Sequence, residues 1–230
     1  MPSRWDVIDL GRMAYGPALE RQRERNAAVA AGTAGPALLL VEHDAVVTVS
    51  RRPAAREHVK VSEAELNRRG IALEPTDRGG DVTYHGPGQL VAYPIVRLRD
   101  LRPSLTLTDY LRGLETAVIA SLNVFGVAGV IECGATGVWV GAGPDAAKVC
   151  AVGVRMRRGV AMHGLALNVD PDLSHFDTID PCGLGDRPVT SLRRRLGDGC
   201  PSMDAVKGEL AAALGRTLGL RPSDRGAAAC

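Results

Sequence analysis

Residues 78–94 read RGGDVTYHGPGQLVAYP, and they carry the strongest structural signal in the chain. Two runs rich in β-branched and aromatic residues, 81–84 and 90–95, flank the glycine- and proline-rich turn HGPGQ. This arrangement is typical of two strands joined as a β-hairpin. The glycines leave the backbone bare, either because turn geometry requires it or because an extended ligand lies against it. We expect a hairpin here, with His85 projecting from its turn.

The same stretch is not a nucleotide-binding loop of a familiar kind. It contains no GxxxxGK[ST] pattern, and no GxGxxG opens a helix. Those patterns place backbone N–H groups around phosphates. The bare backbone therefore favours a ligand other than a nucleotide.

Outward from this stretch, strand-like and helix-like segments follow one another without strict alternation. Further strands are predicted at residues 5–10, 38–41, 46–50, around 130, at 137–140, 149–156 and 165–169, and helices at 17–31, 62–70, 108–122 and 205–218. Irregular order argues against a doubly wound sheet. The sequence predicts an α+β fold, a mixed β-sheet flanked by helices, in one domain spanning residues 1–230. A small subdomain after Cys182 is the alternative.

Composition points to a soluble protein. Hydrophobic residues make up 45% of the chain and charged residues 23%, which is ordinary for a globular domain. No apolar run approaches the ~20 residues of a membrane helix, and the first residues do not resemble a signal peptide. We expect a cytoplasmic protein that does not bind membranes.

The charge distribution makes nucleic acid an unexpected partner. The net charge is only +2, and two Trp, four Tyr and two Phe are few for stacking on bases. Arginines nevertheless cluster at residues 97–102, 155–158 and 193–195. Such clusters are either solvated faces or docking sites for an acidic partner, and both interpretations stay open.

One lysine stands out because the chain otherwise uses arginine. Of 28 cationic residues only Lys60, Lys148 and Lys207 are lysines. Lys60 lies in a polar segment and Lys207 in an amphipathic one, whereas Lys148 lies among small and apolar residues. Lysine can lose its proton when it is buried and arginine cannot. Lys148 is therefore a candidate for acid–base chemistry.

Five cysteines form no CxxC pair and no cluster with zinc spacing, so we expect no metal. Cys133 and Cys150 fit the common role of a small buried hydrophobe, whereas Cys200 lies in a loop and Cys230 in the tail. Cys182 differs, because DPCGLGD places it in a turn between proline and glycine, where a loop can present a nucleophile. Attack requires the thiolate, which a nearby cation stabilises. Lys148 or a histidine, His85 or His163, is a candidate for that cation.

Three separated segments together resemble the lipoyl(octanoyl) transferase family. They are residues 78–95, the lysine strand KVCAVGV at 148–154, and HGLALNV at 163–169 followed by PCGLGDRPVTSL at 181–192. Order and spacing also match, and the resemblance extends over residues 6–218. It implies the fold of the catalytic domain of biotin and lipoate protein ligases.

The resemblance also implies roles for individual residues. Cys182 corresponds to the nucleophile and Lys148 to the residue that activates it. The implied acyl-binding residues are Arg78, Gly79, Gly80, Asp81, Val82, Thr83, Tyr84, His85, Ala151, Val152, Gly153, Gly164, Leu165 and Ala166. The chain departs from the pattern at Cys150, where alanine is common, and residues 141–147 are slightly lengthened. Cys150 is expected to leave a second thiol near the site.

The reaction that this resemblance implies is transfer of an octanoyl group without a cofactor. The donor would be octanoyl-acyl carrier protein. The acceptors would be lysines of the lipoyl domains of 2-oxoacid dehydrogenase complexes and of the glycine cleavage H protein. Three alternatives remain: an ATP-dependent lipoate–protein ligase of the same fold, a hydrolase pairing Cys182 with His85 or His163, and a non-catalytic binder of acyl carrier protein.

Overall fold

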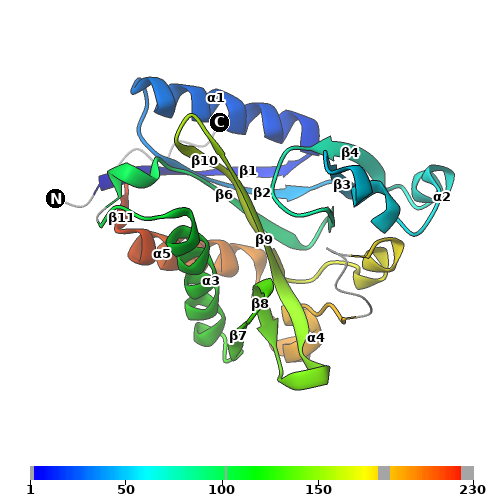
Figure 1. The fold of residues 1–230 in the computed structure, drawn as a ribbon. Coiled ribbons are helices and arrows are strands. Elements are labelled where there is room, and N and C mark those ends of the chain that lie inside the picture. The colour runs from blue at the N-terminus through cyan, green and yellow to red at the C-terminus, as the bar shows by residue number, and fades with distance from the viewer. Residues whose placement is uncertain (1–2, 102, 181–186, 224–230) are drawn as a thin grey trace.

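A computed structural model describes residues 3–101, 103–180 and 187–223 (Figure 1). Its strands are β1 (Ser3–Met13), β2 (Ala37–His43), β3 (Val46–Ser50), β4 (Ala72–Thr76), β5 (Val82–His85), β6 (Gln89–Ile95), β7 (Gly129–Glu132), β8 (Ala135–Val140), β9 (Ala147–Arg157), β10 (Val160–Asn168) and β11 (Leu220–Pro222). The α-helices are α1 (Tyr15–Ala31), α2 (Glu63–Arg68), α3 (Leu107–Val124), α4 (Leu192–Leu196) and α5 (Met203–Leu218). Short 3₁₀ turns cover Pro53–His58, Leu98–Asp100, Gly143–Asp145, Leu173–Thr178 and Gly197–Gly199.

The strands form two sheets. The larger has eight strands in the order β11-β1-β2-β6-β10-β9-β8-β7, and the smaller has three in the order β4-β3-β5. β1 pairs in parallel with β2 and β11, and β3 with β4, whereas the remaining pairs are antiparallel. Mixed sheets with flanking helices confirm the predicted α+β fold class.

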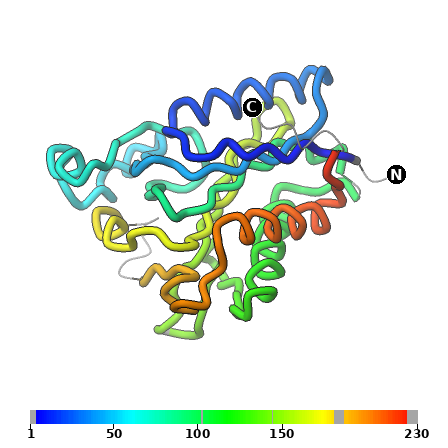
Figure 2. Tube along the Cα trace, turned by 180° about the vertical axis from the view of Figure 1, so that it is seen from behind, coloured from blue at the N-terminus to red at the C-terminus, as the bar shows by residue number. Residues whose placement is uncertain are grey.

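Helices cover both faces of the large sheet, as Figures 1 and 2 show from opposite sides. On β2, Leu39 and Val41 pack in a cluster with α1, whereas Leu38 and Leu40 pack in a cluster with α3 and α5. Successive side chains of a strand point to opposite faces. A strand buried on both faces therefore reads as the unbroken apolar run ALLLV.

Local sequence signals explain where the main helices begin and end. Thr106 caps α3, since its hydroxyl accepts a hydrogen bond from the Asp109 amide at 3.1 Å and the Asp109 carboxylate bonds back to the Thr106 amide. Ser62 caps α2 by accepting from the Glu65 amide. α1 ends at Gly32 in the left-handed conformation.

The predicted hairpin around HGPGQ is wrong. β5 belongs to the small sheet, where it pairs with β3, and β6 belongs to the large sheet between β2 and β10. Both edges of β6 are thus occupied, so β5 has no place beside it. The turn instead carries the chain from one sheet to the other.

The structure also contains a strand that the sequence analysis did not predict. β4 was not predicted, because ALEPT is largely exposed and contains proline, which strands tolerate at a sheet edge. Within residues 187–223, Leu210 and Leu214 of α5 lie in the main core, and β11 extends the large sheet. Among the described residues, no helix combines the length and apolarity needed to cross a membrane.

Candidate active site

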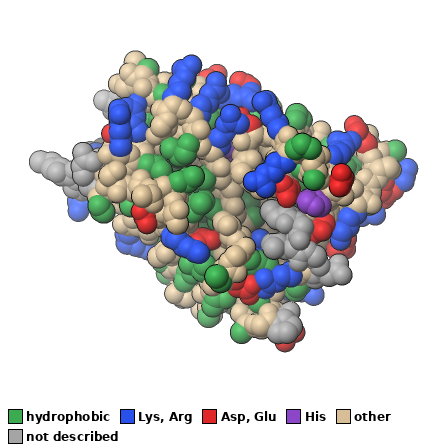
Figure 3. Space-filling view, in the orientation of Figure 1, with side chains coloured by type: hydrophobic (Ala, Val, Ile, Leu, Met, Phe, Trp, Pro, Cys, Tyr) green, Lys and Arg blue, Asp and Glu red, His purple; other side chains and the backbone are tan. Residues whose placement is uncertain are grey.

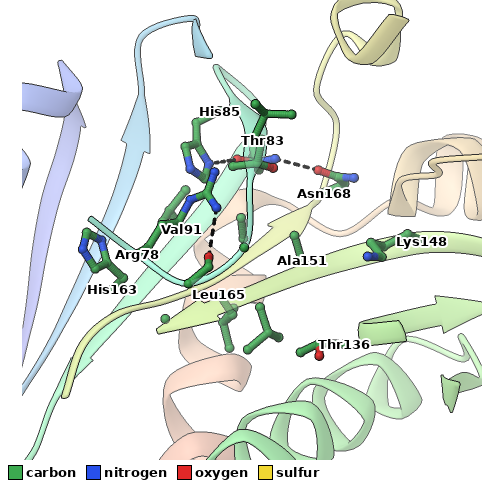
Figure 4. A pocket seen from close by; sticks show the side chains of 18 of the residues that line it. Arg78, Thr83, His85, Val91, Thr136, Lys148, Ala151, His163, Leu165 and Asn168 are labelled. Atoms are coloured by element: carbon green, nitrogen blue, oxygen red, sulfur yellow. Dashed lines mark hydrogen bonds between the residues drawn. The ribbon is translucent and has the colours of Figure 1, made fainter. Parts of the chain in front are cut away.

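A cavity of about 280 Å³ is lined by the neighbouring strands β6, β10 and β9 of the large sheet and by the segment 78–85, which includes β5 of the small sheet (Figure 4). Of the residues expected to bind the acyl group, the cavity is lined by Arg78, Gly79, Gly80, Val82, Thr83, His85, Ala151, Val152, Gly153, Gly164, Leu165 and Ala166, together with Lys148. Three segments far apart in the sequence therefore meet at one cavity.

Residues 78–80, which we call the strap, cross directly over β9. The Gly79 amide donates to the Val154 carbonyl oxygen at 3.0 Å. A side chain on Gly153 would place its Cβ 2.9 Å from the Gly79 oxygen, which is too close without movement of the backbone. Glycine at both positions is what lets the strap lie on the strand.

Arg78 ties the strap to the small sheet. Its Nη2 donates to the carbonyl oxygen and to the hydroxyl of Thr48 on β3, at 3.1 and 3.0 Å. Its Nη1 donates to the Gly79 oxygen at 3.0 Å, as Figure 4 shows. The arginine thus spans from the strap to β3 across one end of the cavity.

Asp77, which precedes the strap, attaches it to β9 and β10 of the large sheet. Its carboxylate accepts from His163 Nε2 at 2.8 Å and lies 3.1 Å from Arg155 Nη1. The His163 hydrogen bond is the main cause that lowers the pKa of Asp77 to about 2. Burial lowers the pKa of His163, against the opposing effect of Asp77. His163 has a φ of 57°, which is strained for a residue other than glycine.

A chain of buried hydrogen bonds runs from His85 along the cavity wall. His85 Nδ1 donates to Gln89 Oε1 at 2.7 Å, and Gln89 Nε2 donates to Asn168 Oδ1 at 2.9 Å. Asn168 Nδ2 donates to the Thr190 oxygen at 3.0 Å. Burial holds the pKa of His85 well below its usual value. His85 is therefore a neutral, fixed part of the wall.

Two tyrosines line the strap end of the cavity, and His43 bonds to one of them from behind. Tyr15 and Tyr93 line it, and the Tyr15 ring is stacked on His85 with centroids 6.2 Å apart. The Tyr93 hydroxyl lies 2.7 Å from His43 Nε2, and burial lowers the pKa of His43 to about 4. The sequence reading missed both tyrosines. Alternation along β6 from Gln89 would have indicated Tyr93, whereas nothing in the sequence marks Tyr15.

Lys148 lies at the opposite end of the cavity and is 9% exposed. Its Nζ sits 4.8 Å from the centre of the Trp139 ring. Its amide donates to the Pro188 oxygen, and its oxygen accepts from the Thr190 amide, both at 2.9 Å. The segment that begins at Arg187 therefore runs beside Lys148.

Cys182 falls in residues 181–186, outside the described residues. The chain on either side of that segment is placed by specific contacts. The Asp180 amide donates to the His58 oxygen at 2.7 Å. Arg187 lies 3.8 Å from the Trp139 ring and pairs with Glu132. Both the lysine and the chain that follows the cysteine segment thus contact the same indole.

Two residues expected to bind the acyl group point away from the cavity. The Asp81 carboxylate lies 3.4 Å from Arg52 and 3.6 Å from His58. The Tyr84 hydroxyl bonds to His175 Nδ1 at 2.8 Å, and its ring packs against Phe176. In β5, Thr83 and His85 share the face that lines the cavity, whereas Val82 and Tyr84 share the face that packs in the core of the small sheet, and Val82 also borders the cavity.

Cys150 lies on the far side of β9, not beside the site as expected. Its side chain is fully buried in the core with α3 and α5. Burial raises the pKa of Cys150 to about 12. This thiol is protonated and inaccessible at neutral pH. Among the described residues, no three His, Cys, Asp or Glu side chains gather closely enough to hold a metal ion.

Comparison with known proteins agrees with this architecture. The lipoyl protein ligase A/B catalytic domain family matches residues 14–215. An octanoyltransferase of Chloroflexus aurantiacus is 48% identical over 214 residues, which cover 93% of each chain. A bipartite lipoate protein ligase of Thermoplasma acidophilum superposes with a TM-score of 0.72 at 19% identity, over 96% of this chain and 86% of that one. Biotin protein ligase of Aquifex aeolicus gives 0.53 at 13% identity, over 93% and 68%. By its sequence and its fold, this chain belongs to the lipoyl protein ligase A/B catalytic domain family.

Proposed function

We propose that this protein is an acyltransferase that moves an octanoyl group from octanoyl-acyl carrier protein to a lysine of lipoyl domains. The observation that carries the proposal is the 48% identity to an octanoyltransferase over 93% of both chains. The solved ligase structures, at lower identity, speak only for the fold. The cavity supports the same activity independently.

The cavity suits a short acyl chain. Val82, Val91, Val152 and Leu165 give it apolar walls. Its volume of about 280 Å³ is slightly below the roughly 300–1,000 Å³ of ligand sites in general. The strap glycines bring the backbone close to the bound chain. In this arrangement the carbonyl carbon lies toward Lys148 and the methyl end toward His163.

Cys182 is the proposed nucleophile and Lys148 its activating group. The ammonium of Lys148 favours the thiolate over the thiol. The thiolate attacks the thioester carbonyl, a bond forms between Sγ and the acyl carbon, and the bond to the carrier's sulfur breaks. The departing sulfur takes a proton from Lys148. The neutral amine of the acceptor lysine then attacks the Cys182 thioester, Cys182 leaves as the thiolate, and Lys148 receives the proton released by the new amide.

The histidines shape the cavity in this proposal. His85 uses Nδ1 to bond Gln89, and His163 uses Nε2 to bond Asp77. Each ring is held in a fixed orientation by that bond, and burial favours its neutral form. The hydrolase alternative would require one of them to activate Cys182.

The partner proteins and the compartment are also part of the proposal. Acyl carrier protein, the lipoyl domains of 2-oxoacid dehydrogenase complexes and the glycine cleavage H protein are the proposed substrates, in the cytoplasm. Cationic side chains gather over α1 at the upper edge of the molecule (Figure 3). Arg157 and Arg158, both exposed, lie at the neighbouring β9–β10 turn. We expect an acidic carrier to dock on this basic face.

Intact-protein mass spectrometry after incubation with octanoyl-acyl carrier protein, without ATP, tests the mechanism. We expect a hydroxylamine-sensitive octanoyl adduct on the wild type and on the matched control Cys150→Ala. The adduct is absent from Cys182→Ser and forms slowly in Lys148→Ala. Transfer to a lipoyl domain only in the presence of ATP would replace this proposal with the ligase alternative. An adduct that persists in Lys148→Ala but disappears in a variant of His85 or His163 would favour a cysteine–histidine pair.

A further inference from the structure

The pairing of β8 with β9 is irregular at the lysine. Val138 lies opposite Cys150, but Trp139 lies opposite Lys148. Val149 is therefore an extra residue on β9 with no partner on β8. One extra residue of this kind is a β-bulge, and bulges re-aim the side chains beside them.

The bulge determines which face of the sheet Lys148 points to. Lys148 and Ala151 both line the cavity, whereas Val149 and Cys150 both pack in the core with α3 and α5. Strict alternation would place residues 148 and 151 on opposite faces. In a regular register Lys148 would lie opposite Val140, whose side chain is in that same core. The bulge is thus what brings the amine into the cavity.

A glycine and a buried carboxylate hold the facing strand in the shape that this bulge requires. Gly137 of β8 has a φ of 121°, and a Cβ there would lie 2.5 Å from the Cys150 oxygen. The Gly137 amide donates to Glu115 Oε1 of α3 at 2.8 Å. Arg112 Nη1 donates to the other carboxylate oxygen at 2.7 Å.

Glu115 is an unexpected residue at its position. It is 1% exposed and lies on the helix face that carries Leu114, Val118 and Leu122. A carboxylate in an apolar core is costly unless hydrogen bonds compensate it. Here two hydrogen bonds compensate it, one from Arg112 and one from the Gly137 amide beside the bulge.

We propose that Glu115 is a positioning residue for Lys148: by holding the Gly137 amide it fixes the β8–β9 bulge that directs the lysine into the cavity. The inference rests on the proposed function in one respect, namely that Lys148 takes part in acyl transfer. The geometry that it concerns can be measured without any reaction.

Lysine-selective NMR reads that geometry directly. The chain has only three lysines, Lys60, Lys148 and Lys207, so ¹³Cε-labelled lysine gives three assignable signals. The Nζ of Lys148 lies 4.8 Å from the Trp139 ring, and the ring current therefore shifts its ε-methylene protons away from the position of an exposed lysine. Loss of the bulge turns Lys148 away from the indole and removes this shift.

Variants of Glu115 separate positioning from general stability. Glu115→Gln keeps an oxygen that accepts from the Gly137 amide and should preserve both the shifted signal and the rate. Glu115→Met removes the acceptor, and Glu115→Asp, a smaller change if the methionine variant fails to fold, withdraws it by one methylene. Both should lose the shift and slow acyl-enzyme formation about 10- to 100-fold, with KM for the octanoyl thioester unchanged. Arg112→Met removes the half-exposed guanidinium that pairs with Glu115 but keeps the acceptor of the Gly137 amide, and it is the matched control.

The two readouts distinguish failure of this inference from failure of the proposed function. A folded Glu115→Met or Glu115→Asp protein with an unchanged Lys148 signal overturns the positioning role, whatever its rate. Loss of the shifted signal in these variants supports the positioning role of Glu115. If Lys148→Ala nevertheless keeps full activity, the proposed role of Lys148 in transfer is contradicted. A lost signal with slow acyl-enzyme formation, restored in Glu115→Gln, supports both.

Discussion

The two ends of the cavity are built from different kinds of interaction. At the strap end, charged and polar side chains bond one another: Asp77 with His163 and Arg155, and Arg78 with Thr48. At the lysine end, main-chain geometry places Lys148 through a bulge. In the proposed function, the first arrangement fixes where an acyl chain lies, and the second fixes where a proton is given or taken. Changes at the strap end should therefore affect binding, and changes at the lysine end should affect chemistry.

The largest effect is expected from removal of the amine at the lysine end. Lys148→Met should lower kcat for octanoyl transfer about 10²- to 10⁴-fold, the usual contribution of a positioned proton donor. KM should stay within about twofold, since the acyl walls are unchanged. Steady-state transfer to a lipoyl domain measures both. Lys207→Met, which removes the ion pair between Lys207 of α5 and Asp9 of β1, is the matched control. If Lys148→Met raised KM without lowering kcat, the lysine end would serve binding and not chemistry.

A smaller effect of the opposite kind is expected at the strap end. Asp77→Ala removes the carboxylate that bonds His163 and Arg155. It should raise KM for the octanoyl thioester about tenfold and leave kcat nearly unchanged, because the strap is no longer held over β9. The free energy of unfolding, measured by urea denaturation, should fall by about 1.5–3 kcal/mol.

Asp109→Asn is the control for that measurement. Its carboxylate caps α3 at Thr106 and does not line the cavity, so KM should not change. If Asp77→Ala lowered kcat and left KM unchanged, the strap would not be a binding element.

The sequence identifies residues that line the cavity at both ends, but it does not predict the bulge that orients Lys148. Paired glycines and a flanking arginine are local signals, and the lone lysine of an apolar strand is another. The bulge at Val149 leaves no local signal, because it depends on the register in which β9 pairs with β8, and that register is set by contacts between residues that are not adjacent in the sequence. The false hairpin has the same origin: the turn residues were recognised, but β2 and β10 occupy both edges of β6, and β5 pairs with β3 instead.

The Asp77 carboxylate also makes the strap end sensitive to acid. Its pKa is about 2 in the folded protein, mainly because of the His163 hydrogen bond, against an ordinary value of 3.8. The stabilisation is fully present above pH 4 and is lost as the pH falls toward 2. Allowing for solvent screening at this half-buried site, it amounts to about 1–2 kcal/mol.

Urea unfolding of the wild type and Asp77→Asn between pH 5 and pH 2.5 measures this difference. The gap in unfolding free energy should shrink as the pH falls, since protonation makes the two side chains alike in charge. A gap that stays constant over this interval would mean that the charge of Asp77 does not hold the strap.

The smallest effect concerns the basic face, which belongs to neither end of the cavity. Arg157→Gln combined with Arg158→Asn removes two exposed charges at the β9–β10 turn, and asparagine tolerates the positive φ of 53° at residue 158. Association with acyl carrier protein should slow about two- to threefold at low salt, and the difference should vanish near 0.5 M salt, where the Debye length is only ~4 Å. The octanoyl thioester of a small uncharged thiol is the matched substrate, because its transfer needs no docking and should respond to neither change. Equal slowing of both substrates would show that the arginines support the cavity, whereas a salt-independent rate with the carrier would exclude electrostatic docking on this face.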